Sequence, residues 1–280
     1  MKTTLRISII LLSLLIGFAT TGCKKDDKSD EKPADVVRDN AIAERAFSDM
    51  SNQSKAGMIQ AEDETNGGKG LSLVNTDCAT ITITPYDWTT FPKTIVIDYG
   101  AVGCLGNDGV YRRGKINLHT TGWYREEGTV ITITPENYYH NDVLVEGVQT
   151  ITNNGLNTNN NLSFTVYTDG QVTYTGGTIM WISELTSEWI AGEPTILNPW
   201  DDEYLVTGYQ NGETVHGDSY EIVILQALHV KTNCSFIVAG KLKITADGYQ
   251  DDIFVDYGDG TCDNIIVVTY MGQNYTIIMQ

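Results

Sequence analysis

The chain has 280 residues, with 18 basic and 36 acidic side chains, a formal net charge of −18 and a pI near 4.4. This charge argues against a nucleic-acid-binding surface, which needs clustered positive charge. The 27 glycines follow no regular period, which excludes collagen. With 41% apolar residues, the chain can build a packed core, either as one large all-β domain or as two small ones.

The N-terminus predicts a lipoprotein signal peptide over residues 1–22. Lys2 and Arg6 provide the positive region, and residues 7–18 form an apolar stretch too short to span a bilayer comfortably. Small residues then lead to Cys23, as in a bacterial lipoprotein cleavage box, although Thr20 stands where that box has an aliphatic residue. We expect cleavage before Cys23 and lipidation of its thiol, which anchors the protein to the membrane through several acyl chains. The alternative is an ordinary secretory signal.

Residues 23–34 are predicted to form a charged tether behind the lipidated cysteine. Lysines, aspartates and a glutamate fill this segment, which shows no apolar periodicity. A cysteine followed by lysine and a run of acids resembles the export signal of Bacteroidota surface lipoproteins. This resemblance implies an outer-membrane protein displayed on the cell surface; the alternative is retention on the periplasmic side.

Residues 35–66 carry the chain's one convincing helical pattern. Ile42, Ala46, Met50 and Ala61 fall on adjoining rows four residues apart, whereas charged residues lie off this stripe (Glu44, Arg45, Asp49 and Lys55). Asparagine and glycines at 66–68 end the pattern. We expect an amphipathic helix that packs on the rest of the protein, with a free stalk as the alternative.

From residue 71 to 280 the apolar period changes to two. Ile81 and Ile83 alternate with threonines, and the same alternation returns over 94–99, 115–119, 131–134 and 162–167. Strands that expose one face to solvent are typical of antiparallel sheets. Asn-Gly or Asp-Gly turns also recur between these strands. We therefore expect an all-β antiparallel meander of roughly 13–16 strands, folded as a sandwich or an elongated pair of sheets.

Cysteine-marked motifs occur twice and indicate a duplicated β-unit, with 71–170 and 171–280 as the candidate units. Thr-Asp-Cys78 returns as Thr-Asn-Cys234. Asp-Tyr-Gly before Cys104 returns as Asp-Tyr-Gly before Cys262. Four cysteines allow three pairings, and the repeat favours Cys78–Cys104 and Cys234–Cys262, because each unit then closes on itself. Such bridges fit an oxidising envelope, and no two cysteines have the short spacing of a zinc knuckle.

The sequence contains no recognisable catalytic motif. The four histidines share no short metal-ligand spacing (His119, His140, His216 and His229). A nucleophile elbow, a zinc-protease motif and a glycine-rich phosphate loop are also missing from the sequence. Carboxylates are abundant, but no pair stands out as the acid and base of a glycosidase. We expect no catalytic residue and no cofactor.

Two weaker candidate sites remain. Asp256, Asp259 and Asp263 surround two glycines and could hold Ca²⁺. The first copy of the motif keeps the first of these acids, at Asp98, and loses the other two, so the structural alternative, a strand end pinned by a disulfide, is favoured and we expect no metal site. Aromatic residues between 138 and 209 could bind a sugar, but their structural use in the core and in cross-strand pairs is favoured. The candidate ligand residues are Tyr138, Tyr139, Trp181, Trp189, Trp200 and Tyr204.

Several strings resemble an uncharacterised family of Bacteroidota surface lipoproteins over the whole mature chain. They are the Cys-Ala-Thr-Ile-Thr-Ile segment at 78–83, Phe-Pro-Lys-Thr-Ile at 91–95, Asp-Tyr-Gly at 98–100 and 256–258, and Trp-Ile-Ala-Gly at 189–192. The resemblance implies membership in that group. It implies no activity and transfers no site residue, because the group has no assigned function.

The leading hypothesis is therefore a non-enzymatic binding or adhesion protein, anchored to the outer membrane and exposed to the cell exterior. Its expected partners are the membrane, through the lipid anchor, and a glycan or protein ligand, with no nucleic acid. One alternative is a structural subunit of an outer-membrane complex. The other is a hydrolase that uses two carboxylates.

Overall fold

The computed structural model describes residues 32–68 and 79–279, with side chains from residue 35 onward. The predicted signal peptide, the lipidation site Cys23, the tether up to residue 31 and Cys78 lie outside the described residues. Within the unit Glu31–Gln280, one long helix and one large sheet account for most of the chain.

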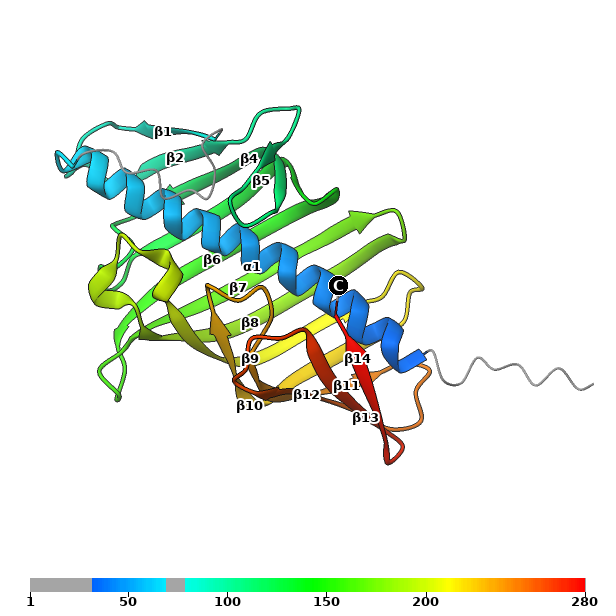
Figure 1. Ribbon diagram of the computed structural model, residues 1–280. Helices are drawn as coiled ribbons and strands as arrows, with labels where there is room; N and C mark the ends of the chain where they lie inside the picture. Colours follow the sequence, from blue (N-terminus) through cyan, green and yellow to red (C-terminus); the bar gives the residue numbers. More distant parts are fainter. Residues whose placement is uncertain (1–31, 69–78, 280) are drawn as a thin grey trace, which may run out of the picture. The chain divides into compact units, whose positions relative to one another are not determined.

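Within the described residues, fourteen strands form a single antiparallel sheet whose order follows the chain from β1 to β14, with β3 paired beside β4 (Figure 1). Short 3₁₀ turns, η1 (Glu193–Thr195) and η2 (Pro199–Asp201), lie between β8 and β9. The strands are β1 (Thr80–Thr84), β2 (Lys93–Asp98), β3 (Cys104–Leu105), β4 (Tyr111–Thr120), β5 (Val130–His140), β6 (Val143–Leu156), β7 (Leu162–Tyr174), β8 (Gly177–Ala191), β9 (Glu203–Glu213), β10 (Ser219–Lys231), β11 (Ala239–Ala246), β12 (Ile253–Asp259), β13 (Ile265–Tyr270) and β14 (Gln273–Ile278).

The predicted antiparallel meander and its number of strands are confirmed. The expectation of a sandwich or a pair of sheets is wrong, because the described strands join into one sheet. The alternating pattern shows that one face of each strand is buried, and it does not say what buries it. Here the second layer is the helix α1 (Lys32–Thr65), which lies along one face of the sheet (Figure 1).

The helix α1 begins at Lys32, slightly before the predicted start, and ends where predicted, at Asn66 and Gly67. Gly67 adopts a positive φ of 82°, and the backbone N–H of Asn66 donates to the carbonyl of Glu62. The predicted apolar stripe is buried, with Ala46, Phe47 and Met50 almost inaccessible to solvent. The helix therefore packs on the sheet and is not a free stalk.

The helix buries a wider arc than the apolar stripe predicts. Lys55 and Asp49, which the pattern places off the stripe, both contact buried groups of the sheet layer. The loops between the later strands also reach the helix: the backbone N–H of Val215 donates to Asp39, and the Arg45 guanidinium lies over the Phe236 ring. Because these loops cover the helix in addition to the sheet face, polar positions of α1 are enclosed together with apolar ones.

A glycine in the middle of β7 lets the helix approach the sheet closely. Phe47 stacks on Trp181 of β8, with ring centroids 5.1 Å apart and an interplanar angle of 10°. Gly170 is the cross-strand neighbour of Trp181, and a Cβ atom there would lie 2.7 Å from Cζ of Phe47. Any side chain at this position would displace the ring, so glycine makes room for the central aromatic contact of the core.

Candidate functional site

The predicted disulfide of the second repeat is present. Cys234 and Cys262 are joined, with an S–S distance of 2.01 Å. Cys104 is also disulfide-bonded. Its predicted partner, Cys78, lies outside the described residues, so the Cys78–Cys104 pairing stays a prediction.

The two Asp-Tyr-Gly copies form the same local structure. Asp98 accepts the backbone N–H of Gly100 at 2.8 Å, and Asp256 accepts that of Gly258 at 3.0 Å. Each aspartate also pairs with a lysine of the neighbouring strand, Asp98 with Lys115 at 3.2 Å and Asp256 with Lys241 at 2.8 Å. Both glycines have positive φ. The shared sequence therefore encodes a strand end and its turn.

The three acids of the candidate calcium site are engaged in local contacts. Asp256 faces Lys241, Asp259 accepts from the hydroxyl and the backbone N–H of Thr261, and Asp263 accepts the backbone N–H of Ile265. These contacts hold the turns around the second disulfide. Across residues 35–68 and 79–279, no group of three or more His, Cys, Asp and Glu is arranged to hold a metal ion.

The four histidines lie apart from one another, as their spacing indicates. His229 contacts Glu203 at 2.7 Å, between β10 and β9. His140 is buried at the end of β5, and burial lowers its pKa. His119 lies exposed on β4, and His216 lies in the turn after β9.

Most of the candidate ligand-binding aromatics belong to the core. Four of the predicted rings are at most 8% exposed and face α1 (Tyr138, Trp181, Trp189 and Tyr204). Tyr139 is half-buried, with the Arg113 guanidinium 3.4 Å from its ring centroid. Trp200 remains open, with 46% of its surface exposed. A ligand at the protein surface can therefore reach only Trp200 and part of Tyr139 among these residues.

The face of the sheet opposite the helix carries a continuous row of accessible side chains, which we name the outer line. It takes one residue from each strand except β3, each paired with the next across the sheet, and none is buried. Its members, from β1 to β14, are Thr84, Thr94, His119, Thr132, Thr150, Tyr167, Glu184, Tyr209, Val223, Lys243, Phe254, Thr269 and Asn274.

Two tyrosines frame the middle of the outer line. Tyr167 on β7 and Tyr209 on β9 are 43% and 47% exposed, and Glu184 lies between them on β8. The Tyr209 hydroxyl donates to Glu184 at 2.9 Å, which fixes this ring. Adjacent strands lie about 4.7–4.9 Å apart, so the backbones of these two tyrosines are separated by about 10 Å. The sequence did hold a signal for Tyr167, since it lies on the polar phase of its strand.

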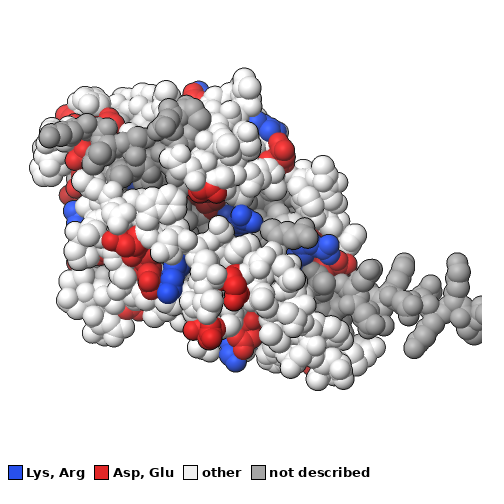
Figure 2. All heavy atoms as spheres, in the orientation of Figure 1, with Lys and Arg blue, Asp and Glu red and all other residues white. Residues whose placement is uncertain are grey.

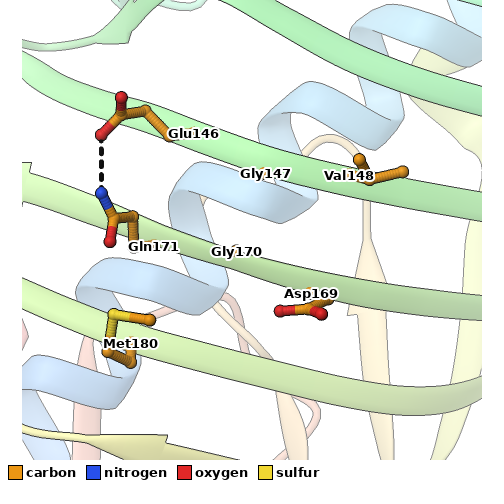
Figure 3. Close-up of a pocket in the computed structure, with 7 residues that line it drawn as sticks. All are labelled: Glu146, Gly147, Val148, Asp169, Gly170, Gln171 and Met180. Carbon is orange, nitrogen blue, oxygen red and sulfur yellow. Dashed lines mark hydrogen bonds between the residues drawn. The ribbon is translucent and has the colours of Figure 1, made fainter.

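A shallow depression of about 290 Å³ lies beside the outer line, over the paired glycines Gly147 and Gly170 (Figure 3). The Gln171 amide donates to Glu146 at 2.8 Å along one side of it. Figure 3 shows the helix on the other side of the sheet, so this hollow opens on the outer face. Its remaining lining residues are Val148, Asp169 and Met180.

A buried arginine holds the helix to the inner face of the sheet. Arg112 of β4 is inaccessible to solvent and donates to Asp49 of α1 at 3.0 Å and to Asp108 at 2.6 Å. The Tyr138 hydroxyl also donates to Asp49, at 2.7 Å. Burial disfavours the Arg112 charge, but the hydrogen bonds to Asp49 and Asp108 outweigh burial and raise its pKa. This cluster is an enclosed structural contact.

The surface charge is mixed and mostly acidic. On the face seen in Figure 2, acidic and basic side chains lie in small groups among uncharged residues, and the described residues there form no continuous basic area. In the described part of the chain, no helix has the length and apolar character needed to cross a bilayer.

Three comparisons with known proteins found no match for the chain. No protein-family model matches it, and neither the curated proteins nor the solved structures contain a match.

Proposed function

We propose that this protein is a surface lipoprotein of a bacterial outer membrane that binds an extended, uncharged polysaccharide with the outer face of its sheet. The signal-peptide pattern ending at Cys23 supports the anchor, and the charged tether supports display on the cell surface. The observation that carries the binding role is the outer line, which crosses the whole sheet without a buried position.

The chemistry of the outer line suits a sugar polymer. Tyrosine rings offer an apolar face for a sugar ring, while their hydroxyls, together with Glu184 and the threonines of the line, offer hydrogen bonds to sugar hydroxyls. The backbones of Tyr167 and Tyr209 lie about 10 Å apart across the sheet, which matches about two units of an extended chain of sugars. A polymer on this track passes close to the depression beside Gly147 and Gly170.

The charge of the protein favours an uncharged polymer over an anionic one. The net charge is −18, and acidic side chains surround the centre of the outer face, among them Glu146, Asp169 and Glu213. These groups repel sulfated or uronic-acid polymers at moderate ionic strength.

The test is native electrophoresis of the full chain through gels that contain one polysaccharide each. We expect neutral β-linked glucans, xylans or mannans to retard the protein and anionic polymers to leave it unaffected. Tyr167→Ala combined with Tyr209→Ala should abolish the retardation. Tyr86→Ala is the matched control, because Tyr86 is 67% exposed and lies off the outer line, and it should bind as the unaltered protein does.

Two results would overturn the proposal. Retardation that survives the double tyrosine substitution would remove the outer line from the binding site. A lack of retardation by every neutral polymer, with a single stoichiometric protein neighbour after crosslinking in cells, would favour the envelope-assembly alternative. Cleavage of a polymer by the purified protein would instead favour the hydrolase alternative.

A further inference from the structure

A lysine of the helix is enclosed by aromatic rings on the inner side of the sheet. The Lys55 ammonium lies 3.6 Å from the ring centroid of Trp189, 5.1 Å from that of Tyr204 and 5.8 Å from that of Tyr124. Only 9% of its side chain is accessible to solvent. Lys55 also donates a hydrogen bond to the Tyr204 hydroxyl. The amine therefore sits in a dry pocket of the core.

The carboxyl group of Asp202 closes this pocket. Asp202 follows η2, its side chain is 3% exposed, and Oδ2 lies 2.6 Å from Nζ of Lys55. The other oxygen, Oδ1, accepts the indole N–H of Trp189 at 3.0 Å. One oxygen thus faces the amine, while the second is held by a fixed donor.

Burial favours the neutral forms of both groups. Burial lowers the pKa of Lys55 to about 8, against the opposing effect of Asp202. Burial also raises the pKa of Asp202. Transfer of one proton from the ammonium to the carboxylate therefore costs less here than in water, and it produces a free amine beside a carboxylic acid.

We propose that Lys55 and Asp202 condense to form an intramolecular isopeptide bond between α1 and the segment that precedes β9. Nζ of Lys55 forms a bond to Cγ of Asp202, and the bond from Cγ to Oδ2 breaks. Oδ2 leaves as water, carrying its own proton and one proton from the amine. The products are one amide and one water molecule, so the step needs no oxidant, reductant or co-reactant.

Each neighbour of the pair has a defined role in this step. The indole N–H of Trp189 stabilises the negative charge that develops on Oδ1 when the amine attacks. The Tyr204 hydroxyl contacts Nζ and can relay the proton that the nitrogen loses. The fixed contact between Nζ and the carboxyl group makes the reaction intramolecular and removes the entropic cost of bringing the two together. The aromatic rings keep bulk water away from the new amide.

Other buried cations in the described residues lack this combination. Arg112 is surrounded by carboxylates, but a guanidinium keeps its proton and does not act as an amine nucleophile. Lys93 is a fully buried lysine beside Phe91 and Trp123, but its neighbouring acid, Asp87, is 41% exposed and 3.6 Å away. Lys93 therefore serves as an internal control for the reaction at Lys55.

The bond would hold the helix on the sheet under load. In the proposed lipoprotein, a pull on the anchor reaches the folded unit through the start of α1. The noncovalent contacts of α1 resist such a pull one after another, whereas a covalent bond at Lys55 stops the helix from being peeled away.

The experiment is peptide mapping of the folded full chain, denatured and then digested with trypsin and a glutamate-specific protease. The expected product is a branched peptide in which residues 46–62 are joined to residues 189–203, with the summed mass minus one water, because Pro194 prevents cleavage after Glu193. Trypsin should not cleave after Lys55. Lys55→Arg and Asp202→Ala should each abolish the branched peptide, and Lys93 should appear only in unbranched peptides.

The unaltered protein alone can decide the question, even if a variant does not fold. Detection of the Cys234–Cys262 disulfide in a non-reduced digest of the same sample verifies that the chain has folded. Complete cleavage after Lys55 in that sample, with separate peptides 46–55 and 189–203, would overturn the proposal. A branch from Lys55 to any acid other than Asp202 would overturn it as well.

Discussion

Two buried cations connect the helix α1 to its surroundings, and their environments differ. Arg112 projects from the sheet and donates to two carboxylates, Asp49 and Asp108, through its guanidinium nitrogens. Lys55 projects from the helix and meets one carboxylate, Asp202, and several aromatic faces. The pKa of Arg112 is raised and the pKa of Lys55 is lowered, although both cations are buried.

The difference shows that the partners of a buried cation determine whether its pKa rises or falls on burial. The hydrogen bonds of Arg112 to two carboxylates outweigh its desolvation, and the Tyr138 hydroxyl donates to one of these acids, Asp49, so the site remains charged. One carboxylate and the weaker attraction of aromatic rings do not repay the desolvation of Lys55. The contacts of one helix can therefore include both a charged ion pair, at Arg112, and a reactive amine, at Lys55.

The largest expected effect comes from removing the cation of the charged site. Arg112→Met leaves Asp49 and Asp108 facing each other without their common partner, and we expect a loss of about 3–5 kcal/mol in the free energy of unfolding. Urea unfolding followed by tryptophan fluorescence measures this loss. A loss below about 1 kcal/mol would show that the cluster is open to water and that the contrast with Lys55 does not hold.

A third titratable group of α1, the partly buried Glu44, extends the comparison to a carboxyl group that forms no ion pair with the described residues. Burial raises the pKa of Glu44 from 4.5 to about 7, and the hydroxyl of Tyr257 is among its neighbours. Between these two pH values the folded state binds a proton that the unfolded state has released. Stability is therefore complete at or below pH 4.5 and falls as the pH rises towards 7, by about 1–3 kcal/mol.

Glu44→Gln removes this dependence and provides the control. Urea unfolding at several pH values between about 5 and 8 should give a steeper decline for the unaltered chain than for the variant. Parallel curves for the two proteins would mean that Glu44 is hydrated in the folded state. Burial without a counter-ion would then not raise the pKa of Glu44 enough to affect the stability of the fold.

The sequence predicted the strands and the helix because both depend on local periodicity. The alternation at Ile81 and Ile83 and the stripe through Ala46 and Met50 report which side of each element is buried. Neither pattern reports what covers that side, and for this reason one sheet with a helical second layer was indistinguishable from a sandwich. The cysteine repeat correctly predicted the Cys234–Cys262 disulfide, because each copy of the repeat contains both cysteines of its own bridge.

The candidate site was harder to predict because it depends on register. Trp181 and Trp189 are conspicuous in the sequence, but they alternate in phase with the buried positions of β8. Tyr167 and Tyr209 lie in the opposite phase, and only the pairing of β7, β8 and β9 brings them onto one line. Likewise, no spacing connects Lys55 with Asp202, because their contact depends on how the helix lies across the sheet.

The smallest expected effect comes from the neighbour of Arg112 on the other face of the same strand. Arg113 lies 3.4 Å from the ring centroid of Tyr139 and pairs with Asp142, which is 91% exposed. Water screens this pair, so Arg113→Ala should lower the free energy of unfolding by less than about 1 kcal/mol. Together with Arg112→Met, the Arg113→Ala variant compares two adjacent arginines that differ mainly in the face of β4 on which they lie. A loss for Arg113→Ala equal to that for Arg112→Met would mean that enclosure by the helix does not set the strength of these contacts.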